Sequence, residues 1–408
     1  MHAAARALPA LLALAAACCP APAPRQPLGL CVGEGGTVLR EGRPFRGMGV
    51  NYFDAFTRTL ADPSDTSYRA GFAELARRGI PFARICGGGF WPADWRLYRE
   101  EPERYFRLLD GVVRAAEAQG VGLIPSLFWH SATVPDLVGE PRDQWGNPHS
   151  RTHAFMRRYV AQVVARYRDS PALWGWEFGN EYNLAADLPN AARHRPPVVP
   201  RLGTPERRSA RDDLSHEMIA VAFAAFAREV RKHDPHRLIS TGNSLPRPSA
   251  WHQWREGTWE PDSPEQFARR LLGDNPDPVD VVSVHVYPGA AARRFGRGAS
   301  LAELLEVAAG VAARAGKPLF VGEFGAWDRD RPGGAAERAA FRRVLAAVVE
   351  ARVPLAALWV YDFDHQAESW NVAPGTPRAY QLEAVAEANR RLREPPAGET
   401  GGQPVPPR

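Results

Sequence analysis

The chain has 408 residues, of which 45% are hydrophobic and 24% are charged, a composition typical of a globular protein with a sizeable core. Its net charge of +5 raises the question of nucleic-acid binding, but only Lys232 and Lys317 among the 51 basic residues are lysines. The arginines are scattered and form no basic stretch of the kind that binds nucleic acid. We therefore expect no nucleic-acid partner.

Residues 1–27 have the pattern of an export signal followed by a tether. The chain begins with a charged segment, followed by an Ala/Leu run to Ala17 with small residues before Cys18. These features are typical of a secretory signal peptide. The Ala/Leu run is too short to span a bilayer. Residues 20–27 are rich in Pro and Ala, which favours an extended tether. Cys18 loosely resembles a lipoprotein attachment site, although the usual Leu three residues earlier is absent. We expect a secreted, periplasmic or cell-surface protein without a transmembrane span in its mature form, and lipidation of Cys18 remains open.

Two cysteines remain for the folded part of the chain, Cys31 and Cys86. Two cysteines in an exported protein can pair. The order of elements described next places them at opposite ends of a barrel, however. We expect two unpaired, buried thiols.

Short β-rich runs alternate with amphipathic helical stretches from residue 46 onward, which is the pattern of repeated strand–helix units around a parallel sheet. Helices are predicted between the strands, for example over residues 105–119, 214–232 and 382–392. Eight such units in about 350 residues favour a (β/α)8 TIM barrel, an α/β fold, over an open sheet. The eight predicted strands begin near Phe45, Pro81, Val121, Ala172, Arg237, Val279, Pro318 and Pro354.

The flanks and two long connections complete this organisation. Residues 31–46 predict a short hairpin that could plug the barrel floor, and residues 394–408, rich in Pro and Gly, predict a disordered tail. The expected catalytic domain is therefore 28–393. Residues 184–212 follow the fourth strand and residues 243–262 the fifth; loops of this length are usually functional or disordered, and both belong to the carboxyl-terminal face.

Two predicted strands end in a glutamate. Glu181 follows the apolar residues 174–179, and Glu323 follows a similar run that begins at Lys317. An unpaired buried carboxylate is costly, and the ends of strands four and seven open into the same cleft of a barrel. Two carboxylates across a cleft are the equipment for breaking a glycosidic bond, one as acid and base and the other as nucleophile. Retention of configuration requires a separation of about 5 Å.

Several polar residues near these strand ends could support the two glutamates. Arg84, on the second strand, could keep a carboxylate ionised, or it could pair with Glu177, which we expect one layer lower in a buried ion pair. His285 and Tyr287 share parity on the sixth strand and therefore face the same side. Tyr287 could hydrogen-bond the nucleophile, and Asn180 could reach a sugar 2-hydroxyl.

These residues resemble the signature of glycoside hydrolase family 5, the cellulase and mannanase family of retaining (β/α)8 glycosidases, over roughly residues 30–393. The resemblance implies that Glu181 is the acid/base and Glu323 the nucleophile, and that Trp359 forms the floor of the central sugar subsite. It implies no cofactor and no metal. The matching set is Arg84, His130, Asn180, Glu181, His285, Tyr287, Glu323 and Trp359.

The chain departs from the family pattern at two positions. Tyr182 stands where the family often has Pro after the Asn-Glu pair, so the loop could reshape the leaving-group side. The match of His130 is approximate. The residues Trp174-Gly-Trp-Glu-Phe lean weakly toward the mannanase-like branches. Trp129 and Trp91 are the next candidates for stacking on sugar rings; Trp251, Trp254 and Trp259 are further ones, but twelve tryptophans cannot all be platforms.

Other chemistries find little support in the sequence. His149 and His153 have i, i+4 spacing but no accompanying Glu or third ligand, so we expect no zinc site. Residues 87–89 are three glycines without the Lys-Ser/Thr of a nucleotide site. We predict a monomeric retaining β-glycoside hydrolase, with β-1,4-mannan slightly favoured over β-1,4-glucan or another β-glucan. The alternative from another class is a carbohydrate-binding barrel lipoprotein without turnover.

Overall fold

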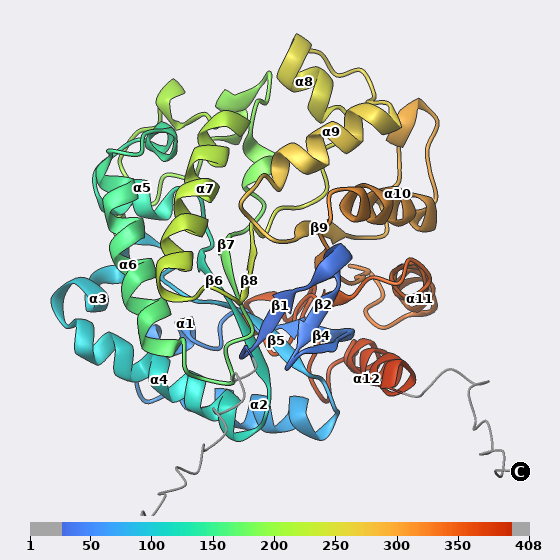
Figure 1. Ribbon diagram of the computed structural model, residues 1–408, viewed down its shortest axis with the longest axis horizontal. Helices are drawn as coiled ribbons and strands as arrows, with labels where there is room; N and C mark the ends of the chain where they lie inside the picture. Colours follow the sequence, from blue (N-terminus) through green and yellow to red (C-terminus); the bar gives the residue numbers. More distant parts are fainter. Residues whose placement is uncertain (1–26, 394–408) are drawn as a thin grey trace, which may run out of the picture.

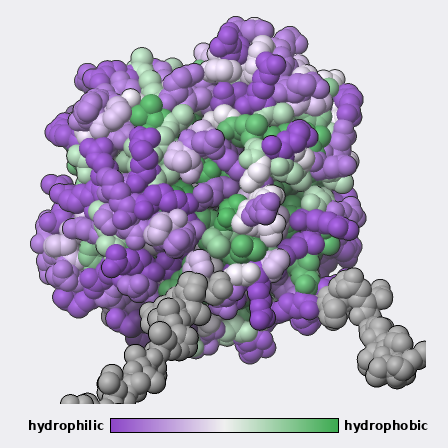
Figure 2. All heavy atoms as spheres, viewed as in Figure 1, coloured by the Kyte–Doolittle hydropathy of each residue, from purple (hydrophilic) through white to green (hydrophobic). Residues whose placement is uncertain are grey.

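The computed structural model describes residues 27–393. The predicted signal peptide with Cys18, and the predicted tail over residues 394–408, lie outside the described residues. Within the described range, no helix combines the length and the apolar character needed to cross a membrane. Hydrophilic side chains dominate the visible outer surface, with apolar side chains gathered near the centre of this face (Figure 2).

Eight parallel strands form the barrel, in the hydrogen-bonded order β8-β7-β6-β5-β4-β11-β10-β9. The Asp280 amide, two residues before β9, donates to the carbonyl of Ile239 in β8 at 2.9 Å, which brings the two end strands of this order together. All eight predicted strands, and the (β/α)8 fold, are confirmed. The strands are β4 (Gly47–Asn51), β5 (Phe82–Cys86), β6 (Gly122–Phe128), β7 (Gly175–Gly179), β8 (Leu238–Ser240), β9 (Val282–Val286), β10 (Leu319–Phe324) and β11 (Leu355–Leu358).

Helices surround the strands (Figure 1). Side-chain caps define several starts: the Ser215 hydroxyl accepts from the Met218 amide before α7, and Ser263 forms a capping box with Gln266 before α9. The long helices are α2 (Tyr68–Arg77), α4 (Pro102–Ala118), α6 (Arg151–Tyr167), α7 (His216–His233), α9 (Pro264–Asp274), α10 (Leu301–Arg314), α11 (Ala335–Glu350) and α12 (Ala379–Arg393). The short ones are α1 (Thr57–Ala61), α3 (Arg96–Glu100), α5 (Thr133–Leu137) and α8 (Ala250–Glu256).

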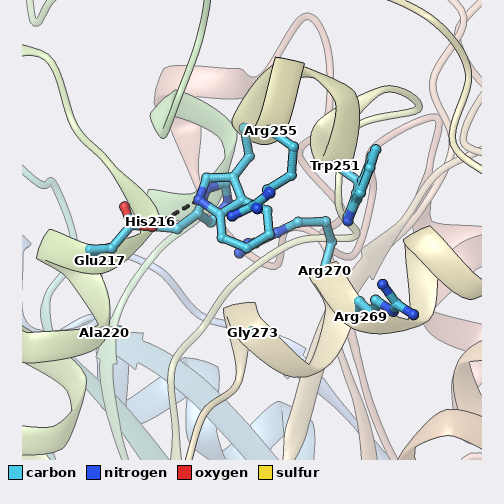
Figure 3. A pocket seen from close by; sticks show the side chains of 9 residues that line it. His216, Glu217, Ala220, Trp251, Arg255, Arg269, Arg270 and Gly273 are labelled. Atoms are coloured by element: carbon cyan, nitrogen blue, oxygen red, sulfur yellow. Dashed lines mark hydrogen bonds between the residues drawn. The ribbon is translucent and has the colours of Figure 1, made fainter. Parts of the chain in front are cut away.

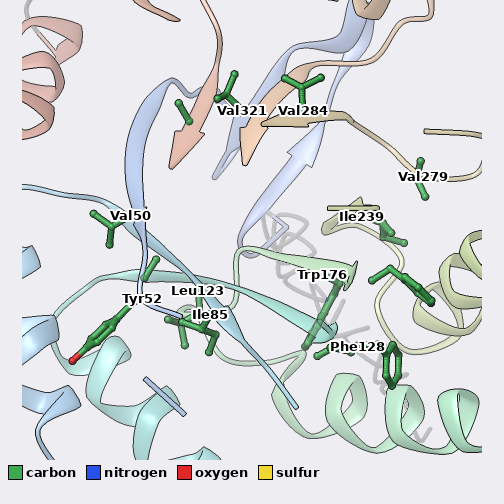
Figure 4. Packing of buried hydrophobic residues seen from close by; sticks show 14 of the residues in the cluster. Val50, Tyr52, Ile85, Leu123, Phe128, Trp176, Ile239, Val279, Val284 and Val321 are labelled. Carbon is green, nitrogen blue, oxygen red and sulfur yellow. The ribbon is translucent and has the colours of Figure 1, made fainter. Parts of the chain in front are cut away.

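Alternate residues of each strand enter two different cores, because successive side chains point to opposite faces of a strand. On β5, Ile85 faces outward and packs in the large cluster under the helices, together with Val50 and Leu123 (Figure 4). Phe82, three residues earlier, faces inward and packs with Ile124 in a second cluster inside the barrel. The carboxyl ends of the strands are left to polar residues, and the site is built there.

A small antiparallel sheet closes the floor of the barrel, as the sequence predicted. It consists of β1 (Leu30–Val32), β2 (Val38–Arg40) and β3 (Arg43–Pro44) and lies across the strand ends in Figure 1. Leu30 and Val38 belong to the cluster inside the barrel, and the Leu30 amide donates to the Trp174 carbonyl at 2.8 Å. The plug leaves the opposite end for ligands.

Both cysteines of the described chain are free, as expected. Cys86 ends β5 and is buried, whereas Cys31 on β1 is only half-buried. The expectation of a buried thiol is therefore wrong for Cys31. Its neighbour Leu30 occupies the inward position of the plug, so the alternation of the strand turns Cys31 away from the barrel.

Candidate active site

Glu181 is held in an unusual backbone conformation directly after β7. Its φ angle is 53°, in the left-handed region that non-glycine residues seldom adopt. Its amide donates to the Gly242 carbonyl at 2.9 Å, and the Asn180 amide donates to the Trp129 carbonyl at 3.1 Å. The turn is thereby tied to the ends of both neighbouring strands, which fixes the carboxylate over the barrel.

Glu323 points into the barrel because of a β-bulge in β10. Val321 pairs with Val284 of β9, but the next pair is Glu323 with His285, so Gly322 is an extra residue. Simple alternation from the inward Phe320 would have turned Glu323 outward to the helices. A Cβ atom at Gly322 would lie 2.9 Å from Nε2 of His285, so the bulge accommodates the imidazole only with glycine.

The two glutamates meet over the centre of the barrel. Carboxylate oxygens of Glu181 and Glu323 and a ring nitrogen of His285 all lie within 4.8 Å of one another. The predicted separation of about 5 Å agrees with this geometry. Both residues are placed at the same end of the barrel by strands that are distant in the sequence, which is the arrangement the sequence predicted.

Arg84 connects the site to the core beneath it. Its guanidinium donates to Glu323 Oε1 at 3.0 Å, to Asn180 Oδ1 at 2.7 Å and to the buried Glu177 at 2.7 Å. It also stacks 4.3 Å from the centre of the Trp129 ring. Arg84 therefore contacts both carboxylates that the sequence offered as its partners, and Glu177 is the lower one, in a buried ion pair.

The environments of the two carboxyl groups differ. Burial raises the pKa of both. Glu323 is 4% exposed, and each of its carboxylate oxygens accepts a hydrogen bond. Arg84 donates to Oε1, and the Tyr287 hydroxyl donates to Oε2 at 2.7 Å. Glu181 has no guanidinium contact, and its side chain is 30% exposed. The contacts with Arg84 and Tyr287 favour the ionised form of Glu323, and Glu181 has neither contact.

His285 lies between the carboxylates. Its Nδ1 is 2.8 Å from Glu181 Oε1 and 3.4 Å from Glu323 Oε2. Burial lowers the pKa of His285 to about 4, so the imidazole is neutral at pH 7. Burial also holds the pKa of Tyr287 well above its usual range, which keeps its hydroxyl a donor. Both residues face the site, as their shared parity predicted.

A cavity of about 850 Å³ opens above the glutamates. Its wall includes Trp91, Trp129 and Trp359, three of the tryptophans that the sequence singled out. Trp359 packs 5.9 Å from Trp129, and its indole N–H donates to Gln366 at 3.0 Å. Flat apolar rings beside two carboxylates suit a sugar, which has apolar C–H faces and polar edges.

Asn180 also lines the cavity. Its side-chain oxygen accepts from Arg84, so its amide nitrogen is the group left to donate.

Sequence reasoning missed several residues of the wall. Asn51, which ends β4 beneath the wall, was also missed; it accepts from Arg84 at 2.9 Å and could have been found by the rule that polar residues end barrel strands. The segment after β11 contributes aromatic and polar side chains that carry no such signal, because they belong to an irregular loop. The unpredicted lining residues include Phe53, Asp54, Arg58, Phe90, Phe363, His365, Gln366 and Trp370.

His130 and Tyr182 are placed differently from the other candidates. His130 does not line the cavity; its ring lies 5.4 Å from that of Phe90 and 5.7 Å from that of Trp91, behind the wall. Tyr182 turns into the core, where its hydroxyl donates to the Phe128 carbonyl at 2.7 Å. Its large ring is accommodated beneath the loop that carries Glu181, so it does not face the cavity.

The two long connections do not contribute to this cavity. Residues 184–212 contain the 3-10 turns η5 (Ala191–His194), η6 (Pro200–Leu202) and η7 (Ala210–Asp212), and Arg208 ties them to Asp136 through two hydrogen bonds of 2.6 and 2.7 Å. Residues 243–262 place Trp251 and Trp254 in a separate pocket between α7, α8 and α9 (Figure 3). No residue of either segment lines the cavity with the glutamates.

The donor atoms of Glu181, His285 and Glu323 are close enough together to hold a cation. The guanidinium of Arg84 already lies 3.0 Å from Glu323, however, and a fixed positive charge competes with a cation for the same carboxylate. The arrangement suits proton transfer and nucleophilic attack better than metal binding.

Comparison with known families identifies the family of the barrel. The family model "Cellulase (glycosyl hydrolase family 5)" matches residues 44–361, which is most of the chain and spans all eight barrel strands. The chain belongs to glycosyl hydrolase family 5. The resemblance that the strand-end residues suggested is thereby confirmed.

Curated relatives of this family 5 chain are mannan endo-1,4-β-mannosidases. A probable one from Aspergillus terreus is 31% identical over 140 residues, covering 33% of this chain and 30% of that protein. One from Podospora anserina is 25% identical over 232 residues, covering 55% of this chain and 51% of that protein. The chain therefore spans about half or less of the length of these relatives.

Solved structures share the barrel. An endo-1,4-β-mannanase from Rhizomucor miehei has a TM-score of 0.63 at 15% identity, covering 89% of this chain and 99% of that one. An exo-β-1,4-mannosidase from Opitutaceae bacterium strain TAV5 has a TM-score of 0.60 at 19% identity, covering 90% of this chain and 64% of that one. At these identities the likeness shows the fold alone.

Proposed function

We propose that the chain is a retaining β-glycoside hydrolase acting on β-1,4-mannan or its oligosaccharides. The observation that carries the proposal is the pair of carboxylates, Glu181 and Glu323, with oxygens within 4.8 Å over a cavity walled by tryptophans. A separation of this size leaves no room for a water between carboxylate and sugar and favours direct attack by one of them. The proposed catalytic unit is 28–393.

Glu323 is the nucleophile in this proposal. The Arg84 guanidinium and the Tyr287 hydroxyl each hold one of its oxygens, which favours the ionised form and fixes the direction of attack. The carboxylate attacks the anomeric carbon, the bond to the leaving oxygen breaks, and a glycosyl ester of Glu323 forms.

Glu181 is the general acid and then the general base. Burial raises the pKa of Glu181, and Arg84 does not touch its carboxyl group, so it can hold a proton. It delivers this proton to the leaving oxygen. In the second step it takes a proton from water, which attacks the ester and releases the sugar with retained configuration.

Asn180 and Trp359 position the sugar. The free amide of Asn180 is oriented by Arg84 and is available for a sugar hydroxyl next to the anomeric carbon, a contact that strengthens at the transition state. Trp359 offers its ring to the apolar face of the same sugar. We place Trp129 and Trp91 in supporting positions along the wall, and His130 behind it.

The names of the relatives favour mannan over glucan as the substrate. The fungal relatives are named mannan endo-1,4-β-mannosidases. A relative from Oryza sativa, 25% identical over 331 residues, is named "Putative mannan endo-1,4-beta-mannosidase 5". The family model is named for cellulase, which keeps β-1,4-glucan as the second candidate. Reducing-sugar release from mannan, carboxymethylcellulose and laminarin would rank the substrates.

The mechanism is tested with the wild type and Glu323→Ala in parallel on the best substrate. Proton NMR of the first product should show the β-anomer before mutarotation, and Glu323→Ala should release no product. An α-anomer would contradict retention. Binding without turnover by the wild type would support the carbohydrate-binding alternative.

We also propose that residues 1–27 direct export. The composition of this segment supports a cleaved signal. Mass spectrometry of the mature amino terminus distinguishes cleavage after Ala17 from lipidation of Cys18, since a lipidated cysteine adds the mass of its acyl chains. An uncleaved Met1 would contradict export by this route.

A further inference from the structure

A row of three aromatic rings runs from Glu323 to the protein surface. The Tyr287 hydroxyl contacts Glu323, and the Tyr287 ring lies 4.9 Å from the ring of Trp370. The Trp370 ring lies 5.8 Å from that of Trp327. Tyr287 and Trp370 line the cavity, whereas Trp327 lies beyond it and is 40% exposed. The row therefore connects the cavity with solvent.

Trp327 extends the aromatic wall of the cavity to the surface. Single exposed apolar side chains are common on proteins, but an exposed ring that is continuous with a cavity wall is typical of a ligand-binding groove. The described residues contain one other strongly exposed tryptophan, Trp259, at 57%. Trp259 belongs to the segment 243–262, which does not reach the cavity, and no aromatic ring of the described chain packs against it.

Trp327 is also held in place from behind. Trp370 packs against it with an angle of 48° between the ring planes, and Tyr287 supports Trp370 in turn. A supported indole loses little conformational freedom when a ligand binds. Its uncovered part offers a flat apolar surface of the kind that stacks on the C–H face of a sugar ring.

We infer that Trp327, supported by Trp370, is an additional sugar-binding platform at the exit of the cavity. Its occupant is a sugar unit of a β-1,4-linked chain whose other units fill the cavity, since the platform is continuous with the cavity wall through Trp370. This inference rests on the proposed function for the class of ligand. It predicts that long oligosaccharides gain affinity from Trp327 and that short ones do not.

The test measures binding without turnover. In the Glu323→Gln background, isothermal titration calorimetry compares Trp327→Ala with the matched control Trp259→Ala, using mannotriose and mannohexaose, with cellotriose and cellohexaose in parallel. Trp327→Ala should weaken hexaose binding about tenfold and leave triose binding unchanged, the size expected for loss of one stacked ring. Trp259→Ala should change neither, and Trp327→Phe should recover part of the affinity.

Equal hexaose affinities for Trp327→Ala and Trp259→Ala would overturn the platform, as would failure of both hexaoses to bind. An equal loss for triose and hexaose would also overturn it, because it would indicate that Trp370 and Tyr287 have moved. Failure of the proposed function is a separate outcome. If the wild type binds hexaose through Trp327 but cleaves no glycan, the platform is supported and the hydrolytic activity is contradicted.

Discussion

The hydroxyl of Tyr287 offers the sharpest test of how Glu323 is kept ionised. Tyr287→Phe removes one donor from Oε2 and keeps the ring that packs against Trp370. A hydrogen bond to a charged group contributes about 1.5–3 kcal/mol, and about 1.4 kcal/mol corresponds to a factor of ten. Arg84 still holds Oε1 at 3.0 Å, so we expect the lower part of this range. The value of kcat/KM should fall about 10- to 30-fold at pH 7.

The pH profile identifies the cause. Tyr287 stabilises the ionised form of Glu323 and so lowers its pKa; removing the hydroxyl raises that pKa, which burial already holds above its usual value. Since attack requires the carboxylate, the acidic limb of the kcat/KM profile should move to higher pH. Tyr105→Phe is the control, because its hydroxyl contacts only that of Tyr159 at 2.7 Å, under α4. An acidic limb that stays in place in Tyr287→Phe, with kcat/KM close to wild type, would refute this account.

Three other substitutions probe the rest of the site. Glu181→Gln should lower kcat/KM on mannan by about 10²- to 10⁴-fold and remove the basic limb of its pH profile, because this limb reports the acid that is replaced, whose pKa burial raises. A dinitrophenyl glycoside has a leaving group that needs no proton, so its kcat/KM, which reports the first step alone, should fall less. Equal losses of kcat/KM on both substrates would contradict the acid role. Glu177→Gln removes the buried charge that pairs with Arg84 at 2.7 Å, and it should lower the free energy of unfolding, measured by urea titration, by about 3 kcal/mol. A change below about 1 kcal/mol is the size expected for a solvent-exposed ion pair and would contradict the buried one. Gly322→Ala places a Cβ atom 2.9 Å from His285 Nε2 and should lower kcat/KM about 10²-fold, while circular dichroism shows an unchanged fold. Full activity would show that the bulge tolerates a side chain.

Much of this site could be predicted because its residues end regular strands. His285 lies on β9 and Tyr287 directly follows this strand, two residues later, so alternation alone places both on one side. Arg84 belongs to one apolar run and Glu181 follows another. The carboxyl ends of such strands lie on the same face of a barrel. Trp370 and Gln366 could not be found in this way, because the loop after β11 has no periodicity from which a direction can be read.

The local sequence of apolar runs, helix caps and turn residues determined the eight strands, the helices and the plug, because these depend on side-chain periodicity over short windows. Only the tertiary structure decided how Glu323 faces the site, since the bulge at Gly322 reverses the alternation of β10 and forms through pairing with β9. The tertiary structure likewise decided that Arg84 pairs with both Glu177 and Glu323. A guanidinium has several donors and can bind two carboxylates, but only the fold brings these strands, distant in the sequence, next to one another.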